Sequence, residues 1–350
     1  MKRGIATRSI NKKRLIAIIL VFAIPLLCGC KSETGASEAQ RCSRIYTDLF
    51  DTVTTIVGYA DSEADFDSVC EKAHEELLRW HKELDIYNDY PGMNNLKTVN
   101  DQAGKSPVIL PAEVIDFLKW GLDVAEKTGG AVDMTFGSVI RIWHTYREEG
   151  IHDPAKEKLP AEHELREAAK HTGRELLVLD SEKNTAFLTD PQASLDVGAL
   201  AKGYAEEKAA ASLPDSYLIS IGGNVRATGT AKRGGEKWTV AVQDPDGAGY
   251  LHTVSVTDGA VVTSGDYERY YTVDGKRYCH IISPETLFPA DRWRSVTVIC
   301  KDAGLADALS TALFILPKDE GEKLAKACGA ECFWVAPDGG GIRTDGYITA

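Results

Sequence analysis

Three oxygen-bearing side chains lie close together in a segment near the C-terminus that is predicted to be a helix. Asp307, Ser310 and Thr311 are spaced at i, i+3 and i+4, which places them on one face of that helix. One carboxylate and two hydroxyls are ligands that a hard cation accepts. The alternative is a helix start whose hydroxyls bond back to the previous turn.

A second polar cluster lies at residues 195–203, with the sequence Leu-Asp-Val-Gly-Ala-Leu-Ala-Lys-Gly. Asp196 precedes a predicted helix, and Lys202 falls in its first turns. A helix N-terminus with a carboxylate and an ammonium suits a ribityl or phosphate group. Equally, Asp196 could be an N-cap and Lys202 a solvated charge. Gly222 and Gly223, after a predicted strand, would let the backbone approach a ligand closely, or form a plain turn.

His280 stands at the end of a predicted hairpin strand, four residues before Pro284. Functional side chains are commonly displayed where a strand gives way to a loop. A neutral imidazole is also well suited to accept a proton near neutral pH. The alternative is a histidine with a purely structural role in the strand.

Taken in order along the chain, these segments resemble the ApbE family, the FAD:protein FMN transferases. The similarity begins at residues 50–56, Phe-Asp-Thr-Val-Thr-Thr-Ile, and continues at residues 128–135, Thr-Gly-Gly-Ala-Val-Asp-Met-Thr. It then runs through residues 196–203, 222–224, 264–267, 280–282 and 307–311. The resemblance implies an α+β fold with a T-fold-like ApbE architecture, in which a mostly antiparallel sheet is flanked by helices.

The resemblance also implies a role for individual residues. Tyr87 is expected against the isoalloxazine ring, opposite Phe50, and an aromatic platform suits a flat ring. The implied FAD contacts are Phe50, Tyr87, Ala131, Val132, Asp133, Asp196, Lys202 and Ile281. The implied metal ligands are the Ala199 carbonyl with Asp307, Ser310 and Thr311. Only one of these ligands carries a formal charge, which leaves room for phosphate oxygens.

Family members bind FAD with a divalent cation, usually Mg²⁺, and transfer its FMN half to a threonine hydroxyl of an acceptor protein, releasing AMP. The resemblance therefore implies an enzyme that uses FAD as substrate and forms a phosphoester-linked flavin. Attack on a pyrophosphate requires its negative charge to be neutralised, and a threonine hydroxyl gains from a nearby base. His280 is the candidate base, unless the metal and Asp307 suffice.

Two other functions are compatible with these residues. In the first, water replaces the threonine, and the protein is an extracytoplasmic FAD pyrophosphatase. In the second, the protein is a non-catalytic flavin-binding lipoprotein. A pure binder has no need of a metal site at Asp307, Ser310 and Thr311, so this function is the less favoured of the two.

The elements that must position these residues form a mixed pattern. Apolar periodicity predicts helices over residues 64–84, 111–128, 137–146, 200–213, 305–316 and 320–328. Strands are predicted over residues 45–59, 175–179, 185–189, 217–221, 238–242, 251–256, 269–273, 277–282, 294–300 and 332–336. Segregated helices and frequent hairpins favour an antiparallel α+β fold over a doubly wound parallel sheet. No G-x-G-x-x-G or Walker A motif is present.

The N-terminal segment predicts export. Six basic residues precede an apolar run at residues 15–27 that is too short to span ~30 Å of hydrocarbon, so residues 1–29 are predicted to be a lipoprotein signal peptide. Residues 27–30, Leu-Cys-Gly-Cys, resemble the bacterial lipobox, which makes Cys30 the expected lipid anchor. Residues 30–44 are predicted to form a lipidated, flexible tether, and residues 45–350 the ApbE-like FMN transferase domain. The alternative is a signal anchor with an incidental cysteine.

The net charge of the chain limits the kinds of partner that it is expected to bind. Removing six cations and no acids from a chain of net charge −12 leaves a mature protein near −18. So acidic a protein is not expected to bind nucleic acid, and needs a metal ion or local dipoles to hold phosphates. The expected location is the extracytoplasmic face of the cell membrane, through the lipid anchor. The expected acceptors are flavoprotein domains of membrane redox complexes that carry a target threonine.

Overall fold

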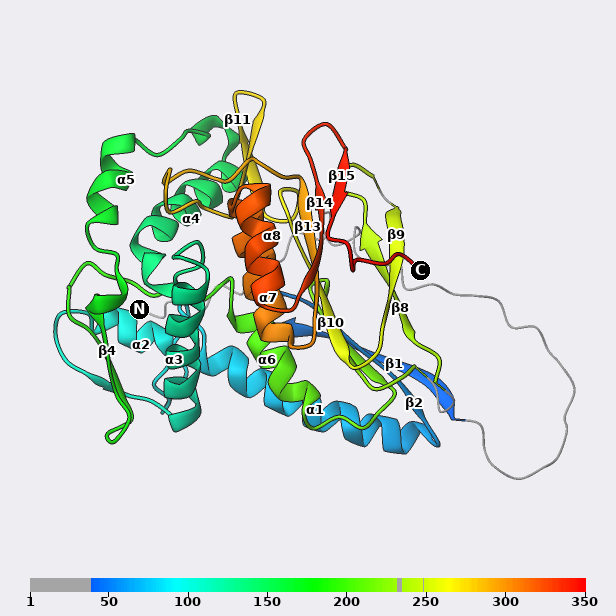
Figure 1. The fold of residues 1–350 in the computed structure, drawn as a ribbon. Coiled ribbons are helices and arrows are strands. Elements are labelled where there is room, and N and C mark those ends of the chain that lie inside the picture. The colour runs from blue at the N-terminus through cyan, green and yellow to red at the C-terminus, as the bar shows by residue number, and fades with distance from the viewer. Residues whose placement is uncertain (1–38, 232–234, 248) are drawn as a thin grey trace, which may run out of the picture.

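The computed structural model describes residues 39–231, 235–247 and 249–350, and Figure 1 shows their fold. The predicted signal peptide and Cys30 lie outside the described residues. Within the described ranges, no helix is both long and apolar enough to cross a bilayer.

A large sheet forms the centre of the described chain, and each of its strands runs antiparallel to its neighbours. Its eight described strands lie in the order β1-β2-β6-β7-β10-β13-β14-β15. They are β1 (Gln40–Leu49), β2 (Thr52–Ala60), β6 (Tyr217–Ile221), β7 (Asn224–Thr228), β10 (Gly259–Gly265), β13 (Ser295–Cys300), β14 (Glu331–Val335) and β15 (Gly341–Arg343). The predicted class, α+β with an antiparallel sheet, is confirmed.

Smaller strand pairs surround this sheet. One three-stranded unit has the order β3-β5-β4, and two hairpins are β8–β9 and β11–β12. Their bounds are β3 (Val108–Ile109), β4 (Leu177–Asp180), β5 (Thr185–Leu188), β8 (Trp238–Gln243), β9 (Tyr250–Val256), β11 (Tyr270–Val273) and β12 (Lys276–Cys279). Asp274 and Gly275 join β11 to β12 with φ of 49° and 78°. This is the tight turn that their sequence predicts.

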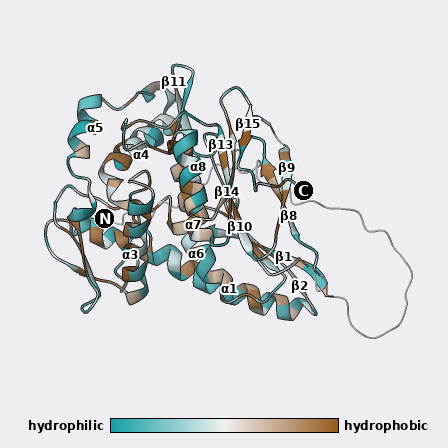
Figure 2. Ribbon diagram, viewed as in Figure 1, coloured by the Kyte–Doolittle hydropathy of each residue, from teal (hydrophilic) through white to brown (hydrophobic). Residues whose placement is uncertain are grey.

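Helices cover one face of the large sheet and build a lobe beside it (Figure 1). They are α1 (Glu63–Glu83), α2 (Leu96–Asp101), α3 (Ala112–Lys127), α4 (Gly137–His152), α5 (Glu162–Ala169), α6 (Ala201–Ala210), α7 (Ala303–Ile315) and α8 (Lys318–Ala327). The surface helix α5 is mostly hydrophilic (Figure 2), whereas α7 is apolar on nearly all sides, as a buried helix must be.

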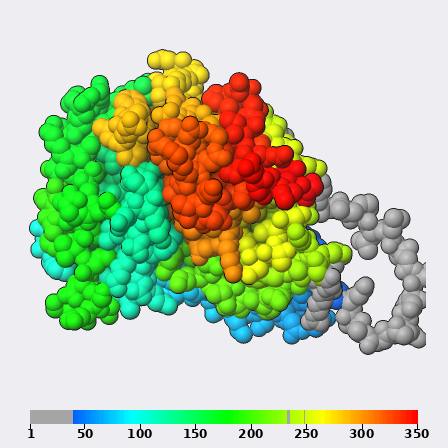
Figure 3. All heavy atoms as spheres, viewed as in Figure 1, coloured from blue at the N-terminus to red at the C-terminus, as the bar shows by residue number. Residues whose placement is uncertain are grey.

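Helix α7 is the buried centre of this arrangement. It packs on α6 at one side and on β10 and β13 of the sheet at another. The outer helix α8 lies over it and forms part of the molecular surface (Figure 3). The other face of the sheet is covered by the β8–β9 hairpin, where Trp238 and Val254 pack against Val57 and Val261. Polar groups on α7 are therefore held in a rigid frame.

Several predicted boundaries are wrong, each for a local reason. The expected strand at 45–59 is a hairpin, because Phe50 and Asp51 take φ of 51° and 53° and reverse the chain between β1 and β2. Strand β1 already begins at Gln40, so residues 40–44 belong to the sheet rather than the tether. Helix α4 runs on to His152 instead of ending at residue 146.

Candidate active site

A cleft of about 440 Å³ opens between the helical lobe and one end of the sheet, where the β1–β2 turn, the β6–β7 turn and the end of β10 line it. It collects side chains from segments far apart in the sequence. The expected site residues that line it are Phe50, Tyr87, Ala131, Val132, Asp133, Asp196, Ala199, Lys202, His280, Ile281, Asp307 and Thr311. Of the residues expected to contact FAD or the metal, only Ser310 does not line it, and Gly222 lines it whereas the neighbouring Gly223 does not.

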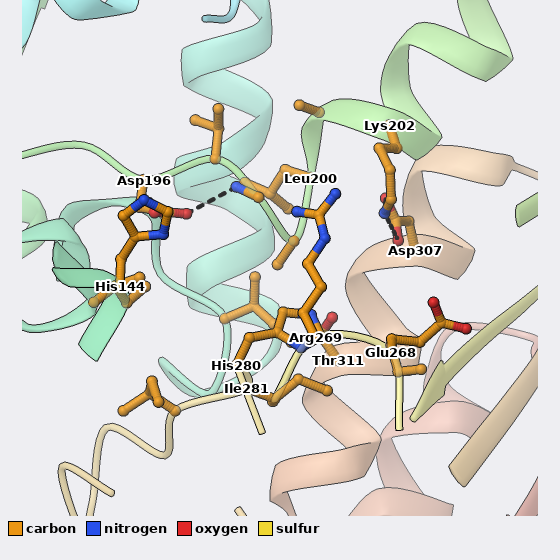
Figure 4. A pocket seen from close by; sticks show the side chains of 18 of the residues that line it. His144, Asp196, Leu200, Lys202, Glu268, Arg269, His280, Ile281, Asp307 and Thr311 are labelled. Atoms are coloured by element: carbon orange, nitrogen blue, oxygen red, sulfur yellow. Dashed lines mark hydrogen bonds and ion pairs between the residues drawn. The ribbon is translucent and has the colours of Figure 1, made fainter. Parts of the chain in front are cut away.

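The contact between α6 and α7 builds one wall of the cleft. At Gly203 an added Cβ would lie 2.4 Å from the Ala303 carbonyl oxygen and 2.5 Å from the Asp307 Cβ. Only glycine permits this approach of the two helices. As a result, the Gly203 N–H donates to Asp307 Oδ2 at 2.9 Å, and Lys202 Nζ lies 3.2 Å from Asp307 Oδ1 (Figure 4).

The oxygen donors on α7 divide between the cleft and the core. Asp307 and Thr311, four residues apart, both line the cleft. Ser310 is fully buried, and its hydroxyl donates to the Asp307 carbonyl at 2.8 Å and pairs with the Ser264 hydroxyl at 2.8 Å. Ser310 does not line the cleft, so its side chain would have to turn toward the cleft to bind a cation there.

The remaining donors suit a hard cation that takes some of its ligands from the protein and the rest from a bound substrate. Asp307 offers a carboxylate, Thr311 a hydroxyl and the Ala199 segment backbone oxygens, all at the cleft wall. In the described parts of the chain, no three His, Cys, Asp or Glu side chains come together to hold a metal ion by themselves. A cation bound here would therefore complete its shell with phosphate oxygens or water.

Asp196 is held in the loop that precedes α6. Its backbone N–H donates to the Met134 carbonyl at 2.8 Å, and its Oδ1 accepts the Gly198 N–H at 2.9 Å. This turn is not an N-cap, because Leu200 occupies that position on α6. Burial raises the pKa of the Asp196 carboxyl above its usual value. The carboxyl is thus poised to meet a hydrogen-bonding ligand inside the cleft.

His280 directly follows strand β12 and faces the middle of the cleft (Figure 4). Its Nδ1 is buried and has no hydrogen-bond partner among the described residues. Burial lowers the pKa of His280 to about 3, with smaller effects from the cations Arg269, Arg147 and Lys202. The ring is therefore neutral at physiological pH, and an anionic phosphate bound beside it would raise its pKa toward the range of an effective general base.

Aromatic rings flank the opposite side of the cleft. The Tyr87 side chain is 53% exposed, and its ring lies 5.2 Å from that of His144 at an angle of 33°. Phe50 in the β1–β2 turn packs edge-on against His81 at 5.4 Å, and its N–H donates to His81 Nδ1. Tyr87 thus offers a ring face on which a flat ligand can stack.

The loop at residues 131–133 is fixed by two side chains. The Thr128 hydroxyl accepts the Val132 N–H at 3.2 Å. The Asp133 carboxylate accepts both the N–H and the hydroxyl of Thr135, at 2.8 and 2.6 Å. Because Asp133 is engaged in this way, the loop presents mainly backbone groups and small side chains to a ligand.

Five charged residues that line the cleft were given no role from the sequence: Asp51, Asp85, Arg147, Glu268 and Arg269. Arg147 was missed because α4 was predicted to stop at residue 146. Once the helix is extended, Ile140, Trp143 and Arg147 recur at helical spacing on the face that lines the cleft. For Glu268 and Arg269 no comparable periodic signal exists, because they lie in the segment between β10 and β11.

A buried acid on α6 was also unexpected. Glu206 is fully buried, and neither carboxyl oxygen has a hydrogen-bond partner among the described residues. Burial, followed by the neighbouring Asp307, raises the pKa of Glu206 well above its usual value. Its neutral form is therefore favoured beside the Lys202–Asp307 pair.

Comparison with known proteins identifies the family of this chain. A model of the ApbE family matches residues 50–334, and the chain belongs to this family. The FAD:protein FMN transferase of Treponema pallidum is 30% identical, over 89% of each chain. That of Haemophilus influenzae is 28% identical, over 96% of each.

Solved structures support the same relationship. The ApbE protein of Thermotoga maritima is 30% identical, with a TM-score of 0.77 over 87% of this chain and 97% of its own. The flavin transferase ApbE of Vibrio cholerae is 25% identical, with a TM-score of 0.70 over 87% of this chain and 97% of its own. The family and the fold implied by the sequence motifs are confirmed.

Proposed function

We propose that this protein is a Mg²⁺-dependent FAD:protein FMN transferase, which moves FMN from FAD to a threonine hydroxyl of an acceptor protein and releases AMP. The observation that carries the proposal is the meeting of three groups in one cleft: the exposed Tyr87 ring, the Asp307 carboxylate and the neutral His280 ring. The printed names of the relatives from T. pallidum and H. influenzae describe the same activity.

The oxygen donors at the α6–α7 wall fit Mg²⁺. Asp307, Thr311 and the Ala199 carbonyl would hold it, with Ser310 joining only if its side chain turns toward the cleft. A bound Mg²⁺ would neutralise charge on the pyrophosphate during transfer. Lys202, which contacts Asp307 here, remains close enough to contact a phosphate at the same wall.

The remaining chemistry falls to the side chains of the cleft. The Tyr87 ring would stack on the isoalloxazine and fix the FMN half. His280 would take the proton of the acceptor threonine as its oxygen forms a bond to the FMN phosphorus. The bond from that phosphorus to the bridging oxygen breaks, and AMP leaves with the electron pair. Asp196 and Ile281 would orient the flavin half, and the loop at 131–133 the adenine half.

A mass measurement on an acceptor tests the proposal. The full-length protein is incubated with FAD, Mg²⁺ and an exported flavoprotein domain that carries a candidate threonine. The expected result is one FMN added to that threonine, equimolar AMP, and no adduct on a Thr→Ala acceptor. Free FMN and AMP formed without an acceptor would indicate a pyrophosphatase instead, and unchanged FAD would indicate a flavin-binding protein.

The location is a separate part of the proposal. The lipobox-like residues 27–30 support a protein anchored by a lipidated Cys30 at the extracytoplasmic face of the cell membrane, near acceptor domains of membrane redox complexes. Mass spectrometry of the membrane-extracted protein should find a diacylglyceryl cysteine at its N-terminus. Cys30→Ala should stall processing or release the protein. A mature chain that still begins at Met1 would contradict the anchor.

A further inference from the structure

The cations of the cleft differ in how their charge is balanced. Lys202 is paired with Asp307, its Nζ 3.2 Å from Oδ1. Arg147 has its nearest carboxylate partner in Glu148, at 3.4 Å, and Glu148 is exposed and does not line the cleft. For Arg269 no ion pair is recorded with any described residue. Two guanidinium groups therefore face the cleft without a carboxylate partner inside it.

The two arginines come from different walls but converge on the same part of the cleft. Arg147 lies on α4, and Arg269 lies in the segment between β10 and β11. The protonation of Asp196 and of His280 responds to both guanidinium groups, so both lie near these two side chains. In Figure 4, Arg269 extends between Asp196 on one side and the Lys202–Asp307 pair on the other.

Arg147 is held in place by a neighbouring ring. Its Nη2 lies 2.7 Å from Nδ1 of His144. Because a guanidinium can only donate, that nitrogen must be the unprotonated acceptor of the imidazole. Burial, together with the Arg147 charge, lowers the pKa of His144, which keeps this nitrogen free to accept. Because the arginine side chain is already oriented in the cleft wall, it loses little further conformational entropy when an anion binds.

Among the described residues, no carboxylate that lines the cleft forms an ion pair with either arginine. Asp196 and Glu268 line the same cleft, but burial raises the pKa of both and disfavours their charged forms. In a strongly acidic protein, two cations that line the same cleft are suited to a ligand that brings negative charge. Guanidinium groups bind phosphate through paired, charge-assisted hydrogen bonds.

We infer that Arg147 and Arg269 form a phosphate-binding subsite that holds the pyrophosphate of FAD independently of the metal ion. The inference rests on the proposed function for the identity of the ligand. It leaves the cation to Asp307 and the phosphate contact at the α6–α7 wall to Lys202, and assigns a second set of phosphate contacts to the arginine pair. Flavin nucleotides should therefore bind before, and without, Mg²⁺.

A binding series in excess EDTA tests this subsite. The full-length protein in detergent is titrated with FAD, FMN and riboflavin, and flavin fluorescence reports the dissociation constants. Wild type should prefer FAD to riboflavin at low salt, and the preference should shrink as salt rises. Arg147→Gln and Arg269→Gln should each weaken FAD binding by about tenfold or more, and leave riboflavin binding unchanged.

Arg141→Gln is the matched control, because Arg141 lies on the same helix as Arg147 but is exposed and outside the cleft. It should bind all three flavins like wild type. Arg269→Lys should recover part of the lost FAD affinity, and thermal unfolding should show each variant to be folded. Equal losses for FAD and riboflavin, or an unchanged FAD affinity, would overturn the subsite.

The outcome is separable from that of the proposed function. If FMN transfer to a threonine is absent but FAD binding in EDTA still depends on the two arginines, the subsite stands and the transferase proposal fails. If transfer is observed while both Arg→Gln variants bind FAD normally, the transferase proposal stands and the subsite fails.

Discussion

The neutral state of His280 should be visible in how stability depends on pH. The native pKa of His280 is lowered to about 3, whereas a histidine in the unfolded chain titrates near ~6.5. Between these values the unfolded state binds a proton that the native state does not. The free energy of unfolding should therefore fall as the pH drops below about 6.5, and this loss should be absent once His280 is replaced.

The size of the effect follows from the same two values. Between pH 7 and pH 5 the single-site linkage amounts to about 2 kcal/mol. Urea unfolding of wild type and His280→Gln at the two pH values should show the wild type losing that much more than the variant. His163→Gln, which removes an exposed histidine of α5, controls for a change of composition. Parallel losses in wild type and His280→Gln would show that His280 is not held neutral in the native cleft.

Three further changes probe the α6–α7 wall. Asp307→Ala should lower FMN transfer by more than about 100-fold and abolish Mg²⁺ binding in calorimetry; wild-type turnover would misplace the metal site. Gly203→Ala places a Cβ 2.4 Å from the Ala303 carbonyl oxygen and should lower the free energy of unfolding by about 1–3 kcal/mol. An unchanged midpoint of thermal unfolding would show that α6 and α7 can move apart without cost. Glu206→Leu removes a buried carboxyl without partners among the described residues and should raise the free energy of unfolding by about 1–3 kcal/mol at pH 7. The gain should be smaller near pH 4, because the carboxyl is then protonated in the unfolded state as well. A loss of stability at pH 7 would contradict the absence of a partner for Glu206.

Much of the fold was accessible from local pattern. Helix α1 was expected at 64–84 and observed at Glu63–Glu83, and β6 was predicted with its observed bounds. These elements carry regular apolar periodicity, because each buries one face. The missed strands β7 and β10 are buried at nearly every position. Without alternation between a buried and an exposed face, they leave no period-two signal.

Residue types and helical spacing could be read from the sequence, whereas the tertiary contacts of each site residue could not. All but one of the residues expected to contact FAD or the metal line a single cleft. Ser310 is the exception: helical spacing placed it beside Asp307 and Thr311, but its hydroxyl is bonded to Ser264 of β10. Periodicity gives the direction of a side chain around the helix axis, but it does not say which neighbouring element lies in that direction.

The sequence by itself determined which residues occur and on which face of a helix or strand many of them lie, because that face follows from neighbours a few residues away. That was enough to indicate the family and a site with oxygen donors, an aromatic ring and a histidine. The tertiary structure alone decided how the charges are paired. Lys202 meets Asp307 because Gly203 lets two helices about a hundred residues apart in sequence touch. Arg147 and Arg269 line the same cleft only because the sheet and the helical lobe fold together around it.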